Sequence, residues 1–149
     1  MRHSTGQKDR ESRLLRQLRE KGYKLTSQRL AIIHLLAGDT SHPSASDVLK
    51  RARKRVPKIS MSTVYYALDM LKREGLIREL EFYEKENRYD INISDHINLV
   101  CRKCGKIEDF MGEVPLSPTE VEGKTGFRPE GMRFEFYGYC RACKNRGKR

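Results

Sequence analysis

The sequence predicts an α+β protein built from two parts. A winged helix-turn-helix domain is expected over residues 1–90, and a small α/β domain with a four-cysteine zinc site over residues 91–149. Two observations support this division: helical patterns followed by two strand-like stretches fill the first part, and all four cysteines lie in the second. Helices that precede a two-stranded hairpin are in the order of a winged helix.

The elements of the first part follow from apolar periodicity and from the residues that begin and end helices. Residues 1–10 are polar, and we expect them to be disordered. Apolar residues recur at helical spacing from Glu11 to Lys21, and Gly22 stops this helix. Further helices are expected over residues 26–38, 43–56 and 60–75. The stretches "IRELEFY" and "RYDINI" alternate like strands, and "EKEN" between them is typical of a hairpin turn.

The second part has a different pattern. The segments "HINLV", "KIEDF" and "MRFEFYG" are strand candidates interrupted by cysteine pairs. A short helix is expected to start at Pro118, and Gly123 should limit its length.

Composition and charge narrow the class of function. The net charge is +11, and residues 1–90 hold most of the excess, with 20 lysines and arginines against 12 acidic residues. Such an excess favours a polyanionic partner. The sequence offers neither a membrane span nor a signal peptide, so we expect a cytoplasmic protein. Phosphate-binding loops and nucleophile or deaminase motifs are missing, so we predict no enzyme.

The fourth predicted helix has one apolar face and one polar face. Met61, Val64, Ala67, Leu68 and Leu71 form the apolar arc, so the opposite side offers hydroxyls, aromatic edges and a guanidinium. These groups contact phosphates and base edges in DNA, although an ordinary surface helix would look similar. The residues predicted to bind DNA are Arg29, Ser62, Thr63, Tyr65, Tyr66 and Arg73. Phosphate contacts are also expected from Lys50, Arg51, Arg53, Lys54, Arg55 and Lys58.

The four cysteines form two CxxC pairs, Cys101 with Cys104 and Cys140 with Cys143. In a reducing compartment such pairs indicate metal ligands rather than disulfides. Four thiolates make a closed tetrahedral site that suits structural Zn²⁺ and leaves no open position for chemistry. The 35 residues between the pairs mean that the zinc would connect distant segments.

Other possible ligands surround the first pair. His96, Asp90, Asp109 and the more distant His42 offer nitrogen and carboxylate ligands of the kind that Mn²⁺, Fe²⁺ or Zn²⁺ accepts. Spacing alone leaves open whether they form a second site, because exposed acidic residues and histidines are common.

Several motifs together resemble the ferric uptake regulator family, and most closely its peroxide-sensing PerR branch. They are "YKLTSQRLAII", "SHPSASDVL", "MSTVYYALDMLKREGLI", "RYDI", "SDHINLVCRKCGKIEDF" and "FYGYCRAC". The resemblance implies a winged-helix DNA-binding domain, an α/β dimerisation domain, and a homodimer that represses transcription at an A/T-rich palindromic operator. It assigns the structural zinc to the four cysteines.

The resemblance also implies a regulatory metal site for Fe²⁺ or Mn²⁺. Its ligands map onto His42, Asp90, His96 and Asp109, and aspartate at both acidic positions resembles the peroxide-sensing branch. In that branch, peroxide oxidises ligand histidines when iron is bound.

One position departs from the family pattern. The family's "DHxH" reads "DHIN" here, so Asn98 stands where a second histidine is usual, and an amide oxygen is a weaker ligand. We expect Asn98 or water to complete the site with reduced affinity. The alternatives are a zinc-stapled DNA-binding regulator without a working sensory site, and an iron-uptake type of regulator.

Overall fold

The chain forms two compact units. The computed structural model describes residues 3–145, with one unit ending at Ile93 and the other beginning at Ser94. The predicted boundary, between residues 90 and 91, lies three residues earlier. Among the described residues, no helix combines the length and the apolar character needed to cross a bilayer.

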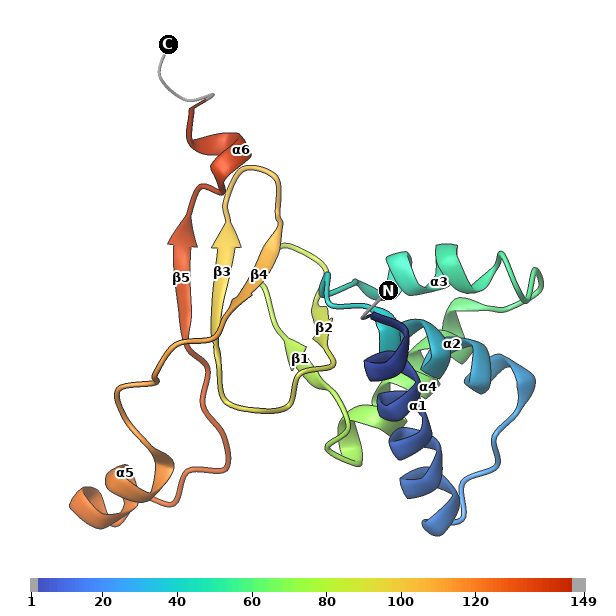
Figure 1. The fold of residues 1–149 in the computed structure, drawn as a ribbon, viewed down its shortest axis with the longest axis horizontal. Helices are drawn as coiled ribbons and strands as arrows, with labels where there is room; N and C mark the ends of the chain where they lie inside the picture. The colour runs from blue at the N-terminus through green and yellow to red at the C-terminus, as the bar shows by residue number, and fades with distance from the viewer. Residues whose placement is uncertain (1–2, 146–149) are drawn as a thin grey trace. The chain divides into compact units, whose positions relative to one another are not determined.

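Four helices and a hairpin make up the first unit (Figure 1). Side-chain hydroxyls cap three of the helices: Thr26 caps α2, Ser44 caps α3 and Ser60 caps α4. The third helix is shorter than predicted: it ends at Ala52, and residues 53–55 form turns before Pro57. The helix bounds are α1 His3–Glu20, α2 Ser27–Gly38, α3 Ala45–Ala52 and α4 Met61–Arg73.

The prediction that residues 1–10 are disordered was wrong for residues 3–10, which form the first turns of α1, and residues 1–2 lie outside the described part of the chain. Tertiary contacts explain the difference. Gln7 Nε2 donates to the carbonyl of His34 at 3.2 Å, and Arg10 Nη1 donates to the carbonyl of Ala37 at 2.9 Å. Both carbonyls lie in the last two turns of α2, and that of Ala37 is among the four that end the helix without an i+4 donor of their own helix. The polar start of α1 is therefore held by the end of α2.

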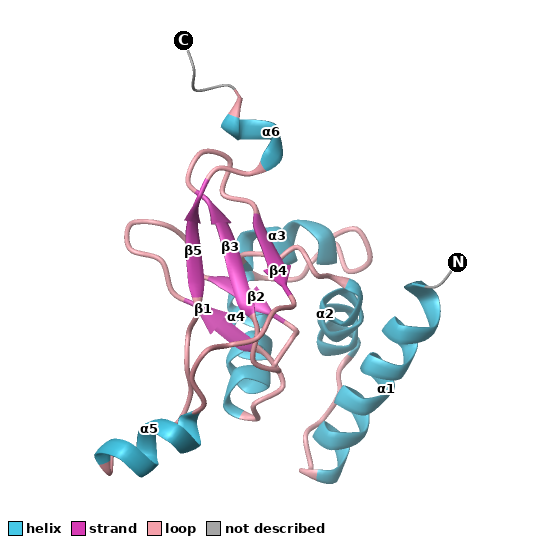
Figure 2. Cartoon of the chain, turned by 60° about the vertical axis from the view of Figure 1, so that its left-hand side comes forward, coloured by secondary structure: helices cyan, strands magenta, loops and turns pink. Residues whose placement is uncertain are grey.

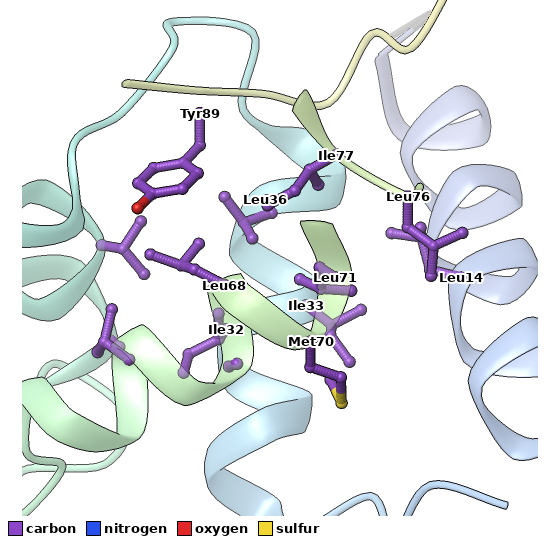
Figure 3. Close-up of a cluster of buried hydrophobic side chains, with 14 of the residues drawn as sticks. Leu14, Ile32, Ile33, Leu36, Leu68, Met70, Leu71, Leu76, Ile77 and Tyr89 are labelled. Atoms are coloured by element: carbon purple, nitrogen blue, oxygen red, sulfur yellow. The ribbon is translucent and has the colours of Figure 1, made fainter. Parts of the chain in front are cut away.

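The core of the first unit lies between its helices and its hairpin (Figure 3). Ile32 and Ile33 of α2 and Leu68 and Leu71 of α4 are completely buried in this cluster. Each such side chain contributes about 1.5–3 kcal/mol by leaving water. This packing fixes α4 with its apolar face inward, as predicted, and with its polar face outward.

The hairpin that follows is the wing. Strands β1 (Arg78–Leu80) and β2 (Arg88–Asp90) pair antiparallel, with Arg78 opposite Asp90. Both strands are shorter than the predicted stretches, so the connection comprises residues 81–87. Tyr89 of β2 packs into the helical core and so anchors the wing.

The second unit is built on a three-stranded sheet in the order β4-β3-β5 (Figure 2). Strand β3 pairs antiparallel with β4 and parallel with β5. The three predicted strands are confirmed as β3 Ile97–Cys101, β4 Ile107–Phe110 and β5 Glu135–Gly138.

Two short helices complete the second unit. Helix α5 (Pro118–Thr125) starts at the predicted proline but continues past Gly123 and ends at Gly126, which has a φ of 70°. Glycine adopts this left-handed conformation without steric cost, which makes it a common helix stop. Gly123 costs no packing, since no residue of α5 is buried, and the capping box of Ser117 and Glu120 supports the helix against the entropic cost of this glycine. Helix α6 (Arg141–Lys144) carries Cys143.

Candidate metal centres and nucleic-acid interface

The four cysteines converge at one end of the sheet of the second unit. Cys101 is the last residue of β3, and Cys140 directly precedes α6. One Sγ atom from each of the four lies within 4.8 Å of the others, and Cys104 Sγ is 3.7 Å from Cys140 Sγ. A tetrahedral zinc ion with bonds of about 2.3 Å places its sulfurs about 3.8 Å apart. The cluster therefore has the dimensions of a four-cysteine zinc site, and all four thiols are free of disulfides.

The local turns that position these thiols follow from the sequence. Gly105 has a φ of 75°, and its N–H donates to the carbonyl of Cys101 at 3.0 Å, which closes the first CxxC turn. In the second pair, the N–H of Cys143 donates to the carbonyl of Cys140 at 2.9 Å. Each pair therefore presents two sulfurs from one tight turn.

The pKa values of the four-cysteine cluster are also those expected of a site for a doubly charged cation. The backbone N–H groups of Cys104 and Cys140 lower the pKa of Cys101 to about 6. Contact with the thiol of Cys140, followed by burial, raises the pKa of Cys143. One thiolate thus forms readily, whereas crowding of the sulfurs opposes a further negative charge. A bound Zn²⁺ removes that opposition, because it neutralises the thiolates that it binds.

A second cluster in the same unit joins His96 to Asn98 of β3 and Asp109 of β4. His96 Nε2 lies 3.2 Å from Asn98 Oδ1 and 3.3 Å from Asp109 Oδ1. Asn98 and Asp109 are directly opposite each other in the antiparallel ladder, so their side chains leave the same face of the sheet. Both His96 and Asn98 are buried.

The other nitrogen of His96 indicates which tautomer is present. His96 Nδ1 is 2.7 Å from the carbonyl oxygen of Ser94, which can only accept a hydrogen bond, so Nδ1 carries the proton. In the neutral ring, Nε2 then directs a lone pair towards the Asp109 and Asn98 oxygens. Three electron-rich atoms that converge in this way suit a cation, and a carbonyl at the far nitrogen is the usual partner of a metal-binding histidine.

In the first unit, His42 and Asp90 form a buried pair. His42 Nε2 is 3.3 Å from Asp90 Oδ2, and the side chains are only 1% and 3% exposed. Asp90 Oδ1 accepts a hydrogen bond of 2.8 Å from the N–H of Asn92, which fixes the carboxylate. The predicted regulatory ligands therefore form two pairs, one within each unit, and both offer nitrogen and oxygen atoms suited to Mn²⁺ or Fe²⁺.

The outward face of α4 presents the side chains predicted to contact DNA. Tyr66 is 73% exposed and Tyr65 is 44% exposed, while Ser62 and Arg73 are also on the surface. Thr63 is less available, because its hydroxyl lies 3.0 Å from that of the capping residue Ser60. Arg29 of α2 donates through Nη1 to the carbonyl of Lys24 at 2.7 Å.

The predicted phosphate contacts lie at the end of α3 and in the segment that leads from it to α4. Of these, Lys50, Arg53, Lys54, Arg55 and Lys58 are exposed. Arg51 differs from them, because its guanidinium forms an ion pair with Asp39. The predicted phosphate contact at Arg51 is therefore the weakest of the set, since this side chain already has an acidic partner.

Two contributors to these sites were missed in the sequence analysis. The backbone carbonyl of Ser94 orients His96, and the N–H groups of Cys104 and Cys140 stabilise the Cys101 thiolate. No residue type marks a backbone group as functional, so spacing could identify the ligands but not these partners.

The chain is similar to several known proteins. A model of the ferric uptake regulator family matches residues 20–137. The chain is 36% identical over 136 residues to the peroxide operon regulator of Bacillus subtilis, a match that covers 89% of this chain and 92% of that protein. It is also 36% identical over 134 residues to the peroxide-responsive repressor PerR of Staphylococcus epidermidis, with 87% of each chain covered.

Solved structures show the same fold. The ferric uptake regulator Fur of Helicobacter pylori, described as having three functional metal binding sites, superposes with a TM-score of 0.70 at 25% identity, over 92% of this chain and 93% of that one. The peroxide stress regulator of Campylobacter jejuni superposes with a TM-score of 0.65 at 31% identity, over 87% of this chain and 98% of that one.

Proposed function

This chain belongs to the ferric uptake regulator family, and we propose that it is a peroxide-responsive repressor whose DNA binding depends on a metal ion. Regulators of this family bind DNA and act as dimers. We propose an A/T-rich palindrome as the operator, since the two-fold symmetry of a dimer calls for two related half-sites. A regulator of this kind works in the cytoplasm, and we assign no catalytic residues to it.

The observation that carries the proposal is the environment of His96. Its Nε2 atom faces Asp109 Oδ1 and Asn98 Oδ1 in a buried site, and these three atoms are all possible ligands of one cation. We propose that this cluster and the His42–Asp90 pair bind the regulatory metal, Mn²⁺ or Fe²⁺, and that the four cysteines bind structural Zn²⁺.

Use of both pairs would couple metal binding to DNA binding. One pair belongs to the unit with the recognition helix, and the other belongs to the second unit. An ion that takes ligands from both favours one arrangement of the units, and this arrangement sets the spacing of the two recognition helices in a dimer. Metal and DNA then strengthen each other's binding by the same factor.

For DNA recognition we propose the exposed face of α4. Ser62, Thr63, Tyr65, Tyr66 and Arg73 would contact the operator, with Arg29 and the basic segment before α4 on the phosphates. Tyr66 offers a hydroxyl and an aromatic edge, so it can contact a thymine methyl group as well as a polar base edge.

The decisive test is a titration of Mn²⁺ into zinc-loaded protein while binding to an A/T-rich palindromic duplex is followed by fluorescence anisotropy. We expect Mn²⁺ to raise DNA affinity at least tenfold, and His96→Ala to abolish the rise. His34→Ala is the matched control, because His34 lies on α2 beside Glu11, outside both metal clusters. The proposal would be overturned if Mn²⁺ left the DNA affinity of the unmodified protein unchanged.

Peroxide sensing has its own test. Iron-loaded protein treated with hydrogen peroxide should gain one oxygen atom, about 16 Da, on His42 or His96, with peroxide as the oxidant. Manganese-loaded protein should not change in mass. Peptide mass spectrometry locates the added oxygen, and unmodified histidines in the iron-loaded sample would leave a metal-responsive regulator without peroxide sensing, such as one of the iron-uptake type.

One observation favours a second candidate function. Asn98 offers an amide oxygen where the family pattern has an imidazole, which weakens the site. The candidate is a zinc-stapled DNA-binding regulator without a working sensory site. It predicts one zinc per chain and a DNA affinity that Mn²⁺ and Fe²⁺ leave unchanged.

A further inference from the structure

The backbone at His42 is held in an unusual conformation. Its φ is 57°, in the left-handed region that non-glycine residues rarely adopt. Such a residue persists only where its surroundings over-determine it, and these conformations cluster at functional sites. The neighbouring strand of the wing supplies the surroundings.

The side chain of Arg88 in β2 donates hydrogen bonds to the peptide groups on both sides of His42. Its Nε donates to the carbonyl of His42, and its Nη2 donates to the carbonyl of Ser41 at 3.3 Å. The guanidinium is a rigid planar fork, so two of its N–H groups can bind two successive carbonyls at once.

Backbone contacts extend this attachment. The N–H of Tyr89 donates to the carbonyl of Pro43 at 2.9 Å, and Ser44 forms an antiparallel bridge with Arg88. Hydrogen bonds from both the side chain of Arg88 and the main chain of β2 therefore hold the loop from Ser41 to Ser44 against this strand.

The same strand also carries the partner of the His42 imidazole. Asp90 follows Arg88 by two residues, so the two side chains leave the same face of β2. Arg88 holds the backbone of His42, while Asp90 Oδ2 lies 3.3 Å from its Nε2. One strand face thus fixes both the main chain and the side chain of this residue.

We propose that Arg88 is the positioning residue of the His42–Asp90 pair: it holds the left-handed loop so that the imidazole faces Asp90 before a metal binds. Its importance for metal binding rests on the proposed function, whereas its effect on the loop does not. Because β2 is a strand of the wing, Arg88 also links the loop of His42 to the wing.

The test uses zinc-loaded, full-length protein and three variants. Arg88→Met removes the donors but keeps the length of the side chain, and Arg88→Lys restores a positive donor without the planar fork. Lys85→Gln is the matched control, since it removes one positive charge from the exposed connection of the same hairpin. Hydrogen exchange of the Tyr89 amide reports on the loop without added metal, and an Mn²⁺ titration reports on the site.

For Arg88→Met we expect Tyr89 amide exchange and the Mn²⁺ dissociation constant each to rise at least tenfold, with an unfolding midpoint close to that of Lys85→Gln. Arg88→Lys should recover part of both effects. Wild-type exchange and Mn²⁺ affinity in Arg88→Met would overturn the proposal. So would a loss of the whole fold in both Arg88 variants, because this indicates a merely structural role.

If the proposed function were wrong, the experiment would give a different result from the one expected if Arg88 had no positioning role. The unmodified protein would then show no Mn²⁺ binding, while faster Tyr89 exchange in Arg88→Met would still establish the positioning of the loop. Faster exchange with undiminished Mn²⁺ affinity would overturn the role of Arg88 in the metal site and leave the proposed function intact.

Discussion

The two units bury their apolar residues very differently. In the first, leucines, isoleucines and valines from all four helices form a continuous core. Among the described residues of the second, the buried hydrophobic side chains are Ile97, Ile107, Cys101 and Cys143. Two of these four are proposed zinc ligands. Large side chains of the second unit, including Phe110, Phe127, Phe136, Tyr137 and Tyr139, are instead exposed.

The difference in buried apolar residues indicates that the two units are stabilised in different ways. The first unit has enough buried apolar surface to offset the entropy that its chain loses on folding. The second has a small sheet, a helix α5 that buries nothing, and a metal-binding cluster. Small units of this kind usually depend on a metal or on a partner. The dimer of this family and the zinc together can supply what the core does not.

Loss of zinc should produce the largest difference in stability between the two units. We expect Cys101→Ser to unfold the second unit, because zinc binding supplies folding free energy, while the first unit keeps its helices. Hydrogen exchange measures this directly: the amide of Asn98, which donates to Phe134, should lose protection, and the helical amides of Leu68 and Leu71 should keep theirs.

Chelation of zinc from the unmodified protein is the control and should produce the same pattern. Persistent protection at Asn98 in Cys101→Ser would mean that the sheet does not need the zinc site.

The reverse perturbation targets the helical core. Leu68 of α4 is completely buried, so Leu68→Ala should lower the free energy of unfolding of the first unit by about 2–5 kcal/mol. Leu116→Ala, at a half-exposed position of the second unit, should change stability by less than about 0.5 kcal/mol. Urea unfolding of zinc-loaded protein gives both values. Similar losses in the two variants would contradict the contrast between the units.

The sequence predicted most of the fold because its signals are local. Capping residues, apolar spacing and turn residues identified α2, α4 and the three strands of the second unit. Residues 3–10 were missed because their helix depends on the carbonyls that end α2, a contact between segments more than twenty residues apart. The extent of α5 was missed because Gly123 was weighed without the capping box of Ser117 and Glu120, which supports the helix up to Gly126.

The candidate sites divide in the same way. Cysteine spacing predicted the zinc ligands, and the structure brings all four sulfurs together. Composition could not establish that His96 Nε2 faces the Asn98 and Asp109 oxygens, because this depends on strand register and on the Ser94 carbonyl. Nor could it reveal the left-handed backbone at His42, which no glycine marks.

A smaller effect is expected at Asn98, within the second unit. Asn98→His replaces an amide oxygen with an imidazole nitrogen, a better ligand for Mn²⁺ and Fe²⁺. We expect the Mn²⁺ dissociation constant to fall about tenfold, equivalent to about 1.4 kcal/mol, whereas Asn98→Ala should raise it. Isothermal titration of zinc-loaded protein measures both. If the histidine variant binds Mn²⁺ no better than the unmodified protein, Asn98 is not part of the metal site.

The smallest effect concerns the wing, which is acidic although its unit is basic. Glu81, Glu84 and Glu86 are exposed in the connection between its strands, against a single Lys85. Carboxylates near a DNA backbone oppose binding, and the opposition decays over about 10 Å at 0.1 M salt. Replacing the three glutamates with glutamine should therefore raise DNA affinity about two- to fivefold, with a larger gain at low salt.

A matched triple variant separates this local effect from net charge. Glu113, Glu122 and Glu130 of the second unit are also exposed, and their replacement with glutamine changes the net charge by the same amount. If the first unit alone meets the DNA, this variant should leave the affinity within twofold of the unmodified protein. Equal gains from both triples would show that the field of the whole molecule, rather than the position of the wing, governs binding, and the division of labour between the units would have to be abandoned for DNA recognition.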